Sequence, residues 1–302
     1  MRKDLLKKIC KNRAFVVEEA RVRVDGLVAG EKPALQKGLG LEVEDFREYV
    51  YGDDFRHIDW KVTARAPYTD YPRFYVREYR GEKALNMLVL LDCSASMSYG
   101  SKWPTALGVL AFLIEMARKF KDRVGVYTLG LSEPLYIRPQ DPRGLAEYFF
   151  SKVCSEGLTP TGTVQLLDSV GSVLPYVTRH HVVALVTDAA HCVDKFAHAV
   201  RLLRERSMSI YAVLVVDPNE LEVPPLGLAL LEDYETNVAV GLTSSDDADL
   251  LASYLKRHLE TIEYTLRSAG VPSVRVSAYK EIAFKLRKLL ILYSRAREAA
   301  YV

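Results

Sequence analysis

Two short runs of apolar residues, each ending at an aspartate, constrain the fold of this chain more than any other feature. Residues 84–91 are almost entirely apolar and are followed by Asp92, and residues 181–187 are followed by Asp188. A third run, residues 209–216, has the same character. Short apolar runs of this kind are typical of strands that are buried on both faces of a parallel sheet.

Segments with helical patterns separate these runs. We expect helices over residues 106–119, 142–153, 164–177, 193–206, 246–268 and 279–299. We expect further strands, one of them at a sheet edge, over residues 123–129, 135–138 and 273–277. The alternation predicts an α/β fold, a Rossmann-like open, mostly parallel sheet flanked by helices. Ligands bind such sheets outside the carboxyl ends of the strands, where the strand order reverses.

The first part of the chain has a different texture. With 302 residues the chain has room for about two domains. Residues 1–84 are rich in charge, aromatic residues and glycine, with an expected loop over residues 26–41 and a half-exposed strand over residues 41–51. We therefore predict a small N-terminal accessory segment, residues 1–84, followed by the α/β domain, residues 85–302.

Composition and charge exclude several classes of protein. The 41 basic and 39 acidic residues leave a net charge of +2, so a bulk polyelectrolyte partner is not expected. The longest nearly apolar stretch, residues 106–117, is interrupted by Glu115 and is too short to span a bilayer. The cysteines form no C-x-x-C pair, so neither a zinc site nor a disulfide framework is expected at Cys10, Cys93, Cys154 and Cys192. With no targeting signal at its start, the sequence predicts a cytoplasmic protein without a transmembrane segment.

Oxygen-bearing side chains gather at the predicted strand ends. The first apolar strand runs into Asp92-Cys93-Ser94-Ala95-Ser96, a D-x-S-x-S pattern, and the later one ends at Asp188. Between them, Gly162-Thr163 lies in a turn that opens a helix. Carboxylate and hydroxyl oxygens suit Mg²⁺ or Mn²⁺. We predict a metal site made by Asp92, Ser94, Ser96, Thr163 and Asp188.

Two alternatives remain open at this site. Thr159 and Thr161 compete with Thr163 for the role of threonine ligand. Asp92 and the two serines also fit a purely structural role, in which they cap the following turn or helix. In the metal-binding interpretation, an ion held by only two aspartates is electron-poor, and its open coordination position would accept a carboxylate from a partner.

This set of residues resembles a known site. D-C-S-A-S, then G-T, then T-D at a strand end is similar to the metal-ion-dependent adhesion site of von Willebrand factor type A domains. The resemblance covers roughly residues 85–216. It implies a Rossmann-like sheet and a divalent cation held by Asp92, Ser94, Ser96, Thr163 and Asp188, some directly and some through water.

A second resemblance lies upstream. Residues 47–65 read R-E-Y-V-Y-G-D-D-F-R-H-I-D-W-K-V-T-A-R. They meet every fixed position of the signature R-x-Y-x-x-G-D-D-x-R-x-I-D-W-x-x-x-A-R of the domain-of-unknown-function-58 family, whose members place it just before a von Willebrand type A-like domain. Many members carry N-terminal transmembrane helices, and this chain resembles the soluble form. Because members are commonly encoded beside MoxR-type AAA+ ATPases, the resemblance implies such an ATPase as partner.

The signature has a structural and a functional interpretation. Gly52-Asp53-Asp54 is typical of a tight turn. We expect Arg56, Asp59 and Arg65 to form a partly buried ion-pair network, with Trp60 as the anchor that docks the segment on the α/β domain. Alternatively, the segment is a recognition surface, with a partner bound by Arg56, Asp59, Trp60 and Arg65.

The sequence also bears on nucleic-acid binding, membrane-surface binding and hydrolysis. Basic and aromatic residues interleave over residues 55–80, which can indicate nucleic-acid binding, but acidic residues dilute the charge. The basic run at residues 2–13 could contact a membrane surface. A serine hydrolase would pair Ser94 with a histidine and Asp188, but no G-x-S-x-G elbow is present, and no phosphate-binding glycine motif.

The candidate histidines fit a hydrolase poorly. His180 and His181 begin a strand, at the end opposite Asp188, and His191 lies nearer but is expected to be an exposed loop residue. Among enzymes the alternative is a metal-dependent hydrolase, although it would need a denser carboxylate cluster or a second metal. We expect a binding module and not an enzyme.

Overall fold

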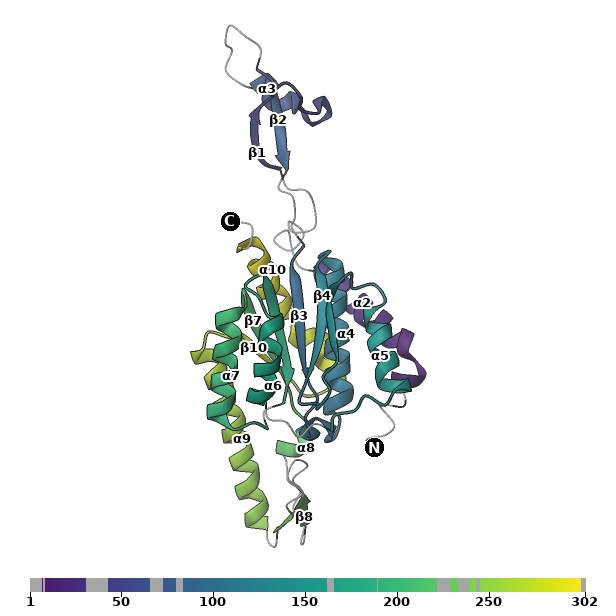
Figure 1. Ribbon diagram of the computed structural model, residues 1–302, viewed down its shortest axis with the longest axis vertical. Helices are drawn as coiled ribbons and strands as arrows, with labels where there is room; N and C mark the ends of the chain where they lie inside the picture. The colour runs from purple at the N-terminus through teal and green to yellow at the C-terminus, as the bar shows by residue number, and fades with distance from the viewer. Residues whose placement is uncertain are drawn as a thin grey trace.

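The computed structural model describes residues 7, 9–30, 43–65, 73–79, 84–161, 166–188, 190–221, 229–232, 239–242 and 245–299. At its centre is a six-stranded sheet in the order β10-β7-β6-β3-β4-β5 (Figure 1). Its strands are β3 (Asn86–Asp92), β4 (Arg123–Leu129), β5 (Tyr136–Gln140), β6 (His181–Thr187), β7 (Ser209–Val215) and β10 (Ser273–Val276). All neighbours are parallel except β5, which pairs antiparallel with β4 at the edge.

The strand order confirms the predicted Rossmann-like α/β fold. If the six strands of this sheet are renumbered 1 to 6 in chain order, their spatial order from β5 to β10 is 3-2-1-4-5-6. This is the order of doubly wound sheets. The order reverses between β3 and β6, which are direct neighbours. Any ligand of this sheet is therefore expected at the carboxyl ends of these two strands.

Helices cover both faces of the sheet because the central strands are apolar on both sides. On β3, Met87, Val89 and Leu91 belong to one core cluster, and Leu88 and Leu90 to the other. The first face is covered by α2 (Arg13–Gly30), α4 (Lys102–Lys119), α5 (Leu145–Ser155) and α10 (Ile282–Ala299). The second is covered by α6 (Leu166–Val173), α7 (Val193–Arg206) and α9 (Ser245–Ser268).

Helix α2 lies before the predicted boundary at residue 84, yet it is part of the main core. Its apolar face packs beside α4, with buried side chains at Val16, Val17, Ala20, Val24 and Val28. The expected loop over residues 26–41 is wrong for residues 26–30, which are helical, and the remainder of that prediction lies mostly outside the described residues.

A disulfide joins the N-terminal part of the chain to α5. Cys10 and Cys154 are bonded, with their Cα atoms 5.6 Å apart and 144 positions apart in the sequence. The expectation of no disulfide is therefore wrong. Cysteine spacing could not reveal this pair, because the two residues meet only when α2 and α5 pack on the same face.

The family signature forms a small unit of its own. Strand β1 (Val43–Glu48) pairs antiparallel with β2 (Tyr75–Tyr79), and η2 (Phe55–His57) and α3 (Trp60–Arg65) lie between them in sequence. β1 falls within the predicted strand at residues 41–51. In Figure 1 this unit lies beyond one end of the six-stranded sheet.

Two expectations for this unit are wrong. The Trp60 side chain is 64% exposed and contacts Phe74 edge to face, so it is not a buried anchor. Arg56 forms its ion pair with Asp54, while Asp59 accepts hydrogen bonds from the backbone N–H groups of Lys61 and Val62. Asp59 therefore caps α3, and the described residues do not show the expected Arg56–Asp59–Arg65 network.

Shorter elements complete the structure. They are η3 (Ala95–Ser98), η4 (Leu174–Tyr176), α8 (Pro218–Leu221), η5 (Tyr279–Glu281) and the antiparallel pair β8 (Ala229–Glu232) and β9 (Ala239–Leu242). The short helix α8 and the β8–β9 pair were not expected from the sequence. Among the described helices, none combines the length and the apolar character that crossing a membrane requires.

Candidate functional site at the strand ends

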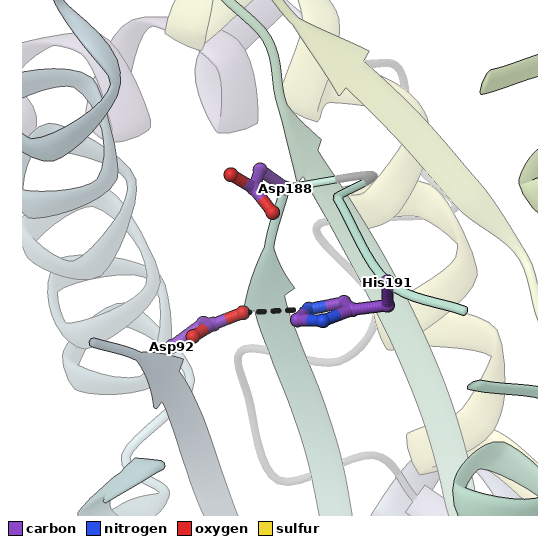
Figure 2. A group of neighbouring side chains, drawn as sticks. All are labelled: Asp92, Asp188 and His191. Atoms are coloured by element: carbon purple, nitrogen blue, oxygen red, sulfur yellow. Dashed lines mark hydrogen bonds and ion pairs between the residues drawn. The ribbon is translucent and has the colours of Figure 1, made fainter. Parts of the chain in front are cut away.

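The two predicted aspartates meet where the strand order reverses. β3 and β6 pair in parallel with Leu91 opposite Val186, so Asp92 and Asp188 leave the sheet at the same edge. Both side chains are buried. Figure 2 shows their carboxylates on neighbouring strand ends, with His191 beside Asp92. The apolar runs fix this geometry, because parallel pairing in register brings their terminal residues together.

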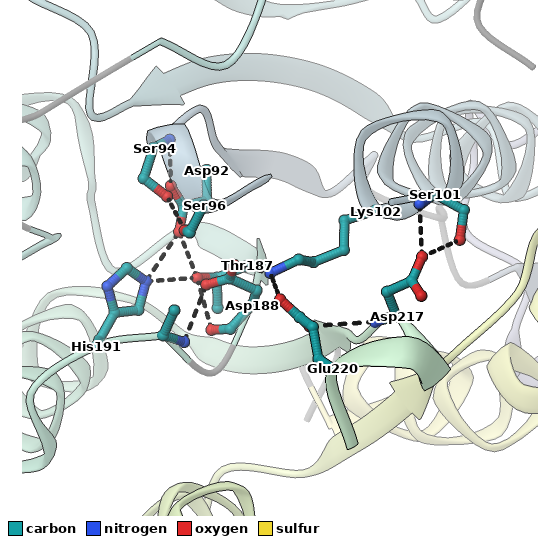
Figure 3. A network of polar contacts seen from close by, with 11 residues as sticks. Asp92, Ser94, Ser96, Ser101, Lys102, Thr187, Asp188, His191, Asp217 and Glu220 are labelled. Carbon is teal, nitrogen blue, oxygen red and sulfur yellow. Dashed lines mark hydrogen bonds and ion pairs between the residues drawn. The ribbon is translucent and has the colours of Figure 1, made fainter. Parts of the chain in front are cut away.

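The D-x-S-x-S loop is closed by its own hydrogen bonds. The backbone N–H of Ser94 donates to Asp92 Oδ1 at 2.8 Å, and the hydroxyls of Ser94 and Ser96 lie 3.0 Å apart. Ser94 is buried and Ser96 half-buried. Asp92 thus performs the turn-capping role considered above. Figure 3 shows both serines beside Asp92, so the capping role and a metal role are compatible.

His191 belongs to the site, which was not expected from the sequence. Its side chain is 9% exposed, and its Nε2 lies 2.9 Å from Asp92 Oδ2 and 2.8 Å from Thr187 Oγ1. The Thr187 hydroxyl donates to the same carboxylate oxygen at 2.5 Å. The expectation that His191 is merely exposed is wrong, because the loop after β6 folds back over the end of β3.

The surroundings of Asp92 favour its charged form. Burial raises the pKa of Asp92, but the hydrogen bond and positive charge of His191, together with hydrogen bonds from Thr187 and Ser94, outweigh burial and hold the pKa at about 2. A buried carboxylate held ionised by donors on three sides is a preorganised anionic site.

The described residues do not form a hydrolase triad. In a triad the histidine uses one ring nitrogen for the nucleophile and the other for the orienting acid. Here the same Nε2 atom faces both Thr187 and Asp92, and the Thr187 hydroxyl is fully buried. Ser94 bonds instead to Ser96. His181 is the first residue of β6, so it lies at the end of the strand opposite Asp188, as predicted.

A buried lysine that was not part of the predicted site forms an ion pair with Asp188. Lys102 is the first residue of α4, and its side chain is 1% exposed. Its Nζ lies 2.7 Å from Asp188 Oδ2 and 2.5 Å from Oε1 of Glu220 on α8 (Figure 3). Burial lowers the pKa of Lys102, but the charges of Asp188 and Glu220 outweigh burial and raise it. The ammonium is therefore a permanent charge of the site.

A third strand-end aspartate braces the start of α4. Asp217 follows β7, and its Oδ2 accepts hydrogen bonds from the backbone N–H and the hydroxyl of Ser101, at 2.6 and 2.9 Å. Gly100 precedes this contact with a φ of +56°, and a Cβ there would lie 2.0 Å from the Asp217 carboxylate. The turn therefore requires glycine, and it sets the position from which Lys102 enters the site.

The donor atoms present fit a hard divalent cation. Asp92, Asp188 and His191 each offer a ligand atom, and these atoms lie within 4.8 Å of one another. Because the His191 Nε2 is hydrogen-bonded to Asp92, the oxygen donors are the two carboxylates. Carboxylate and hydroxyl oxygens are the donors that Mg²⁺ and Mn²⁺ prefer. Of the threonine candidates, Thr163 lies outside the described residues, while Thr159 and Thr161 are exposed.

Comparison with known proteins covers most of the chain. Residues 45–260 match the family described as "Protein of unknown function DUF58". The uncharacterized proteins Rv1480 of Mycobacterium tuberculosis and Mb1516 of Mycobacterium bovis are each 25% identical over 257 residues, which is 83% of this chain and 78% of theirs.

Two solved structures are similar at lower levels. BatB from Bacteroides thetaiotaomicron has 13% identity and a TM-score of 0.44, covering 70% of this chain and 99% of its own. A von Willebrand factor type A protein from Catenulispora acidiphila has 13% identity and a TM-score of 0.39, covering 69% and 42%. Both TM-scores are low, so the fold assignment rests on the strand order of the sheet itself.

Proposed function

This chain belongs to the DUF58 family, and on that premise we propose that it is a protein-interaction module whose binding site is the strand-end carboxylate pair Asp92 and Asp188, acting with Mg²⁺ or Mn²⁺. The observation that carries the proposal is the position of the pair. Both carboxylates are buried at the reversal of strand order, where open α/β sheets bind their ligands.

The residues of the site have different roles in the proposed binding. Asp92 and Asp188 would hold the cation, assisted by the hydroxyls of Ser94 and Ser96 and, as the sequence predicts, by Thr163. When bound, the ion supplies a Lewis-acidic position that a carboxylate of the partner completes. His191 orients Asp92 by a 2.9 Å hydrogen bond. The chain itself thus contributes a preorganised anionic cradle, and the partner contributes an acidic side chain.

The partner we propose is a MoxR-type AAA+ ATPase, as the family resemblance implies. Metal and partner would each supply part of the other's site, so each tightens the binding of the other. Such reciprocal coupling is typically about 5- to 150-fold in affinity. Binding rather than catalysis is the role that we propose, because His191 uses the same ring nitrogen toward Thr187 and Asp92 and so does not link a nucleophile to an orienting acid.

A second docking surface is favoured by a specific observation. On the small unit formed by residues 43–65 and 73–79, Tyr51 is fully exposed and Phe55 and Trp60 are largely exposed. Aromatic side chains of this kind are frequent anchors at protein interfaces. Docking through this unit, including the Arg56, Asp59, Trp60 and Arg65 positions, would not depend on the metal.

One experiment separates the two surfaces. The affinity of the chain for a purified MoxR-type ATPase is measured across a Mg²⁺ series and with chelator, for wild type, Ser96→Ala and Trp60→Ala. Strand-end binding predicts that chelator and Ser96→Ala weaken the complex while Trp60→Ala does not. A response confined to Trp60→Ala assigns the interface to the small unit, and a flat Mg²⁺ response would leave the strand-end site without this role.

A further inference from the structure

The Lys102 ammonium lies between two carboxylates that belong to different elements. It contacts Asp188 at the end of β6 and Glu220 on α8, at 2.7 and 2.5 Å. It also lies 5.8 Å from the centre of the Tyr99 ring. Figure 3 shows the side chain reaching from the start of α4 into the gap between the two acids. A full positive charge therefore stands on one of the two aspartates to which the metal role is assigned.

The oxygens of the aspartate pair already accept hydrogen bonds from the protein. On Asp92, Oδ1 accepts from the Ser94 N–H, and Oδ2 faces Thr187 and His191. On Asp188, Oδ1 accepts from the Ala190 N–H, and Oδ2 accepts from Lys102. A cation approaching Asp188 Oδ2 must share or displace the ammonium. The backbone donors are fixed by the loops, whereas Lys102 is held at the end of a long side chain.

We propose that Lys102 is a built-in competitor of the divalent cation: its ammonium occupies Asp188 until a cation binds there, and it then remains on Glu220. This inference rests on the metal role assigned above to Asp92 and Asp188. It adds a residue that sets the affinity of the site, and it gives Glu220 the role of receiving the displaced charge.

The second carboxylate is what makes the exchange feasible. Leaving a buried ammonium unpaired is costly, so a lysine with one partner would oppose displacement strongly. Lys102 keeps Glu220 when it gives up Asp188, because the two contacts are made at the same time. Glu220 lies on α8, and its Oε2 accepts a hydrogen bond from the backbone N–H of Asp217 at 3.4 Å, which helps to hold the side chain in place. The exchange therefore needs only a small movement of one side chain.

The test is calorimetric titration of the full chain with MnCl₂. Lys102→Met removes the competitor and should tighten Mn²⁺ binding about tenfold or more, because the cation no longer has to displace an ammonium from Asp188. Glu220→Gln removes the receiving carboxylate and should weaken binding roughly three- to tenfold. The double variant removes the pair without leaving Glu220 unpaired, and it should bind Mn²⁺ more tightly than wild type.

The double variant decides between competition and simple charge effects. If only the summed charge near the site matters, removing one positive and one negative group leaves the affinity close to that of wild type, and the proposal is overturned. Equal affinity in wild type and Lys102→Met also overturns it, while leaving the metal role intact. Tight binding by Lys102→Met and by the double variant, with none in wild type, supports competition and removes the metal role from the natural chain.

Two further outcomes complete the test. If no variant binds Mn²⁺, both the competition and the metal role fail. If Lys102→Met does not fold, as circular dichroism would show, the double variant and Glu220→Gln carry the decision, because neither leaves an unpaired carboxylate on α8.

Discussion

His191 Nε2 lies 2.9 Å from Asp92 Oδ2, so the loop after β6 is tied to the end of β3. The bond joins residues 99 positions apart. It also lies at the carboxyl ends of β3 and β6, where the strand order reverses and where a sheet of this kind binds its ligands. The contact therefore serves two purposes: it holds the loop, and it keeps Asp92 ionised and oriented.

The His191 contact predicts a stability cost. His191→Ala leaves Asp92 with fewer donors in a buried position, and we expect it to lower the free energy of unfolding by about 1–3 kcal/mol. Urea unfolding measures this, with His198→Ala as the matched control because His198 is exposed on α7. Equal midpoints for His191→Ala and wild type would show that the hydrogen bond contributes nothing to stability.

Asp92→Asn tests the metal role with little change of shape. The amide keeps the volume of the side chain but loses the charge, so we expect Mg²⁺ or Mn²⁺ binding to be lost. The free energy of unfolding should fall by about 1–3 kcal/mol, because an amide is a poorer acceptor for Thr187 and His191. Calorimetric titration and urea unfolding measure the two effects. Unchanged metal affinity would remove Asp92 from the ligand set.

The Cys10–Cys154 disulfide predicts a redox-dependent stability. Closing a loop of this length restricts the unfolded chain, and typical stabilisation is about 2–4 kcal/mol. We expect Cys154→Ser, or reduction by dithiothreitol, to lower the free energy of unfolding by that amount. Cys192→Ser is the control, because Cys192 is a free, exposed cysteine. If dithiothreitol does not change the unfolding midpoint of wild type, the disulfide is not formed in solution.

His181 predicts a loss of stability in mild acid. Burial, and to a smaller extent the neighbouring His180, lower the pKa of His181, whose Nδ1 accepts the Thr178 N–H at 3.0 Å. The unfolded chain therefore binds the proton more readily. Its contribution to stability is present above about pH 6.5 and is lost as the pH falls toward the folded pKa, by at most about 1.4 kcal/mol per pH unit.

The matched variant for this effect is His181→Asn. Its side-chain oxygen can accept the same N–H but does not titrate between pH 5 and 7. Urea unfolding across that range should show a shallower pH dependence for His181→Asn than for wild type. Parallel curves would show that other groups account for the acid sensitivity.

Trp60→Ala is expected to change stability little. The side chain is 64% exposed and its described ring contact is with Phe74, so the loss should stay below about 1 kcal/mol. Tyr264→Ala, at an exposed aromatic residue of α9, is the control. A loss of several kcal/mol, measured by urea unfolding, would restore the buried-anchor interpretation.

The sequence predicted the sheet and its aspartates because both depend on local pattern. An apolar run of strand length followed by an aspartate specifies a buried strand and a polar end, and parallel pairing places Asp92 and Asp188 at one edge. The strands at residues 123–129 and 181–187 were predicted at the bounds observed.

The tertiary structure alone decided which polar residues join these aspartates. Lys102 and His191 stand in segments without periodicity, and nothing in their neighbourhood along the chain shows that α4 begins beside β6 or that the loop after β6 folds over β3. The same holds for Cys10 and Cys154, which meet only through the packing of helices. A buried charge is stable only where partners from other elements surround it, so its position is a property of the assembled fold and not of the local sequence.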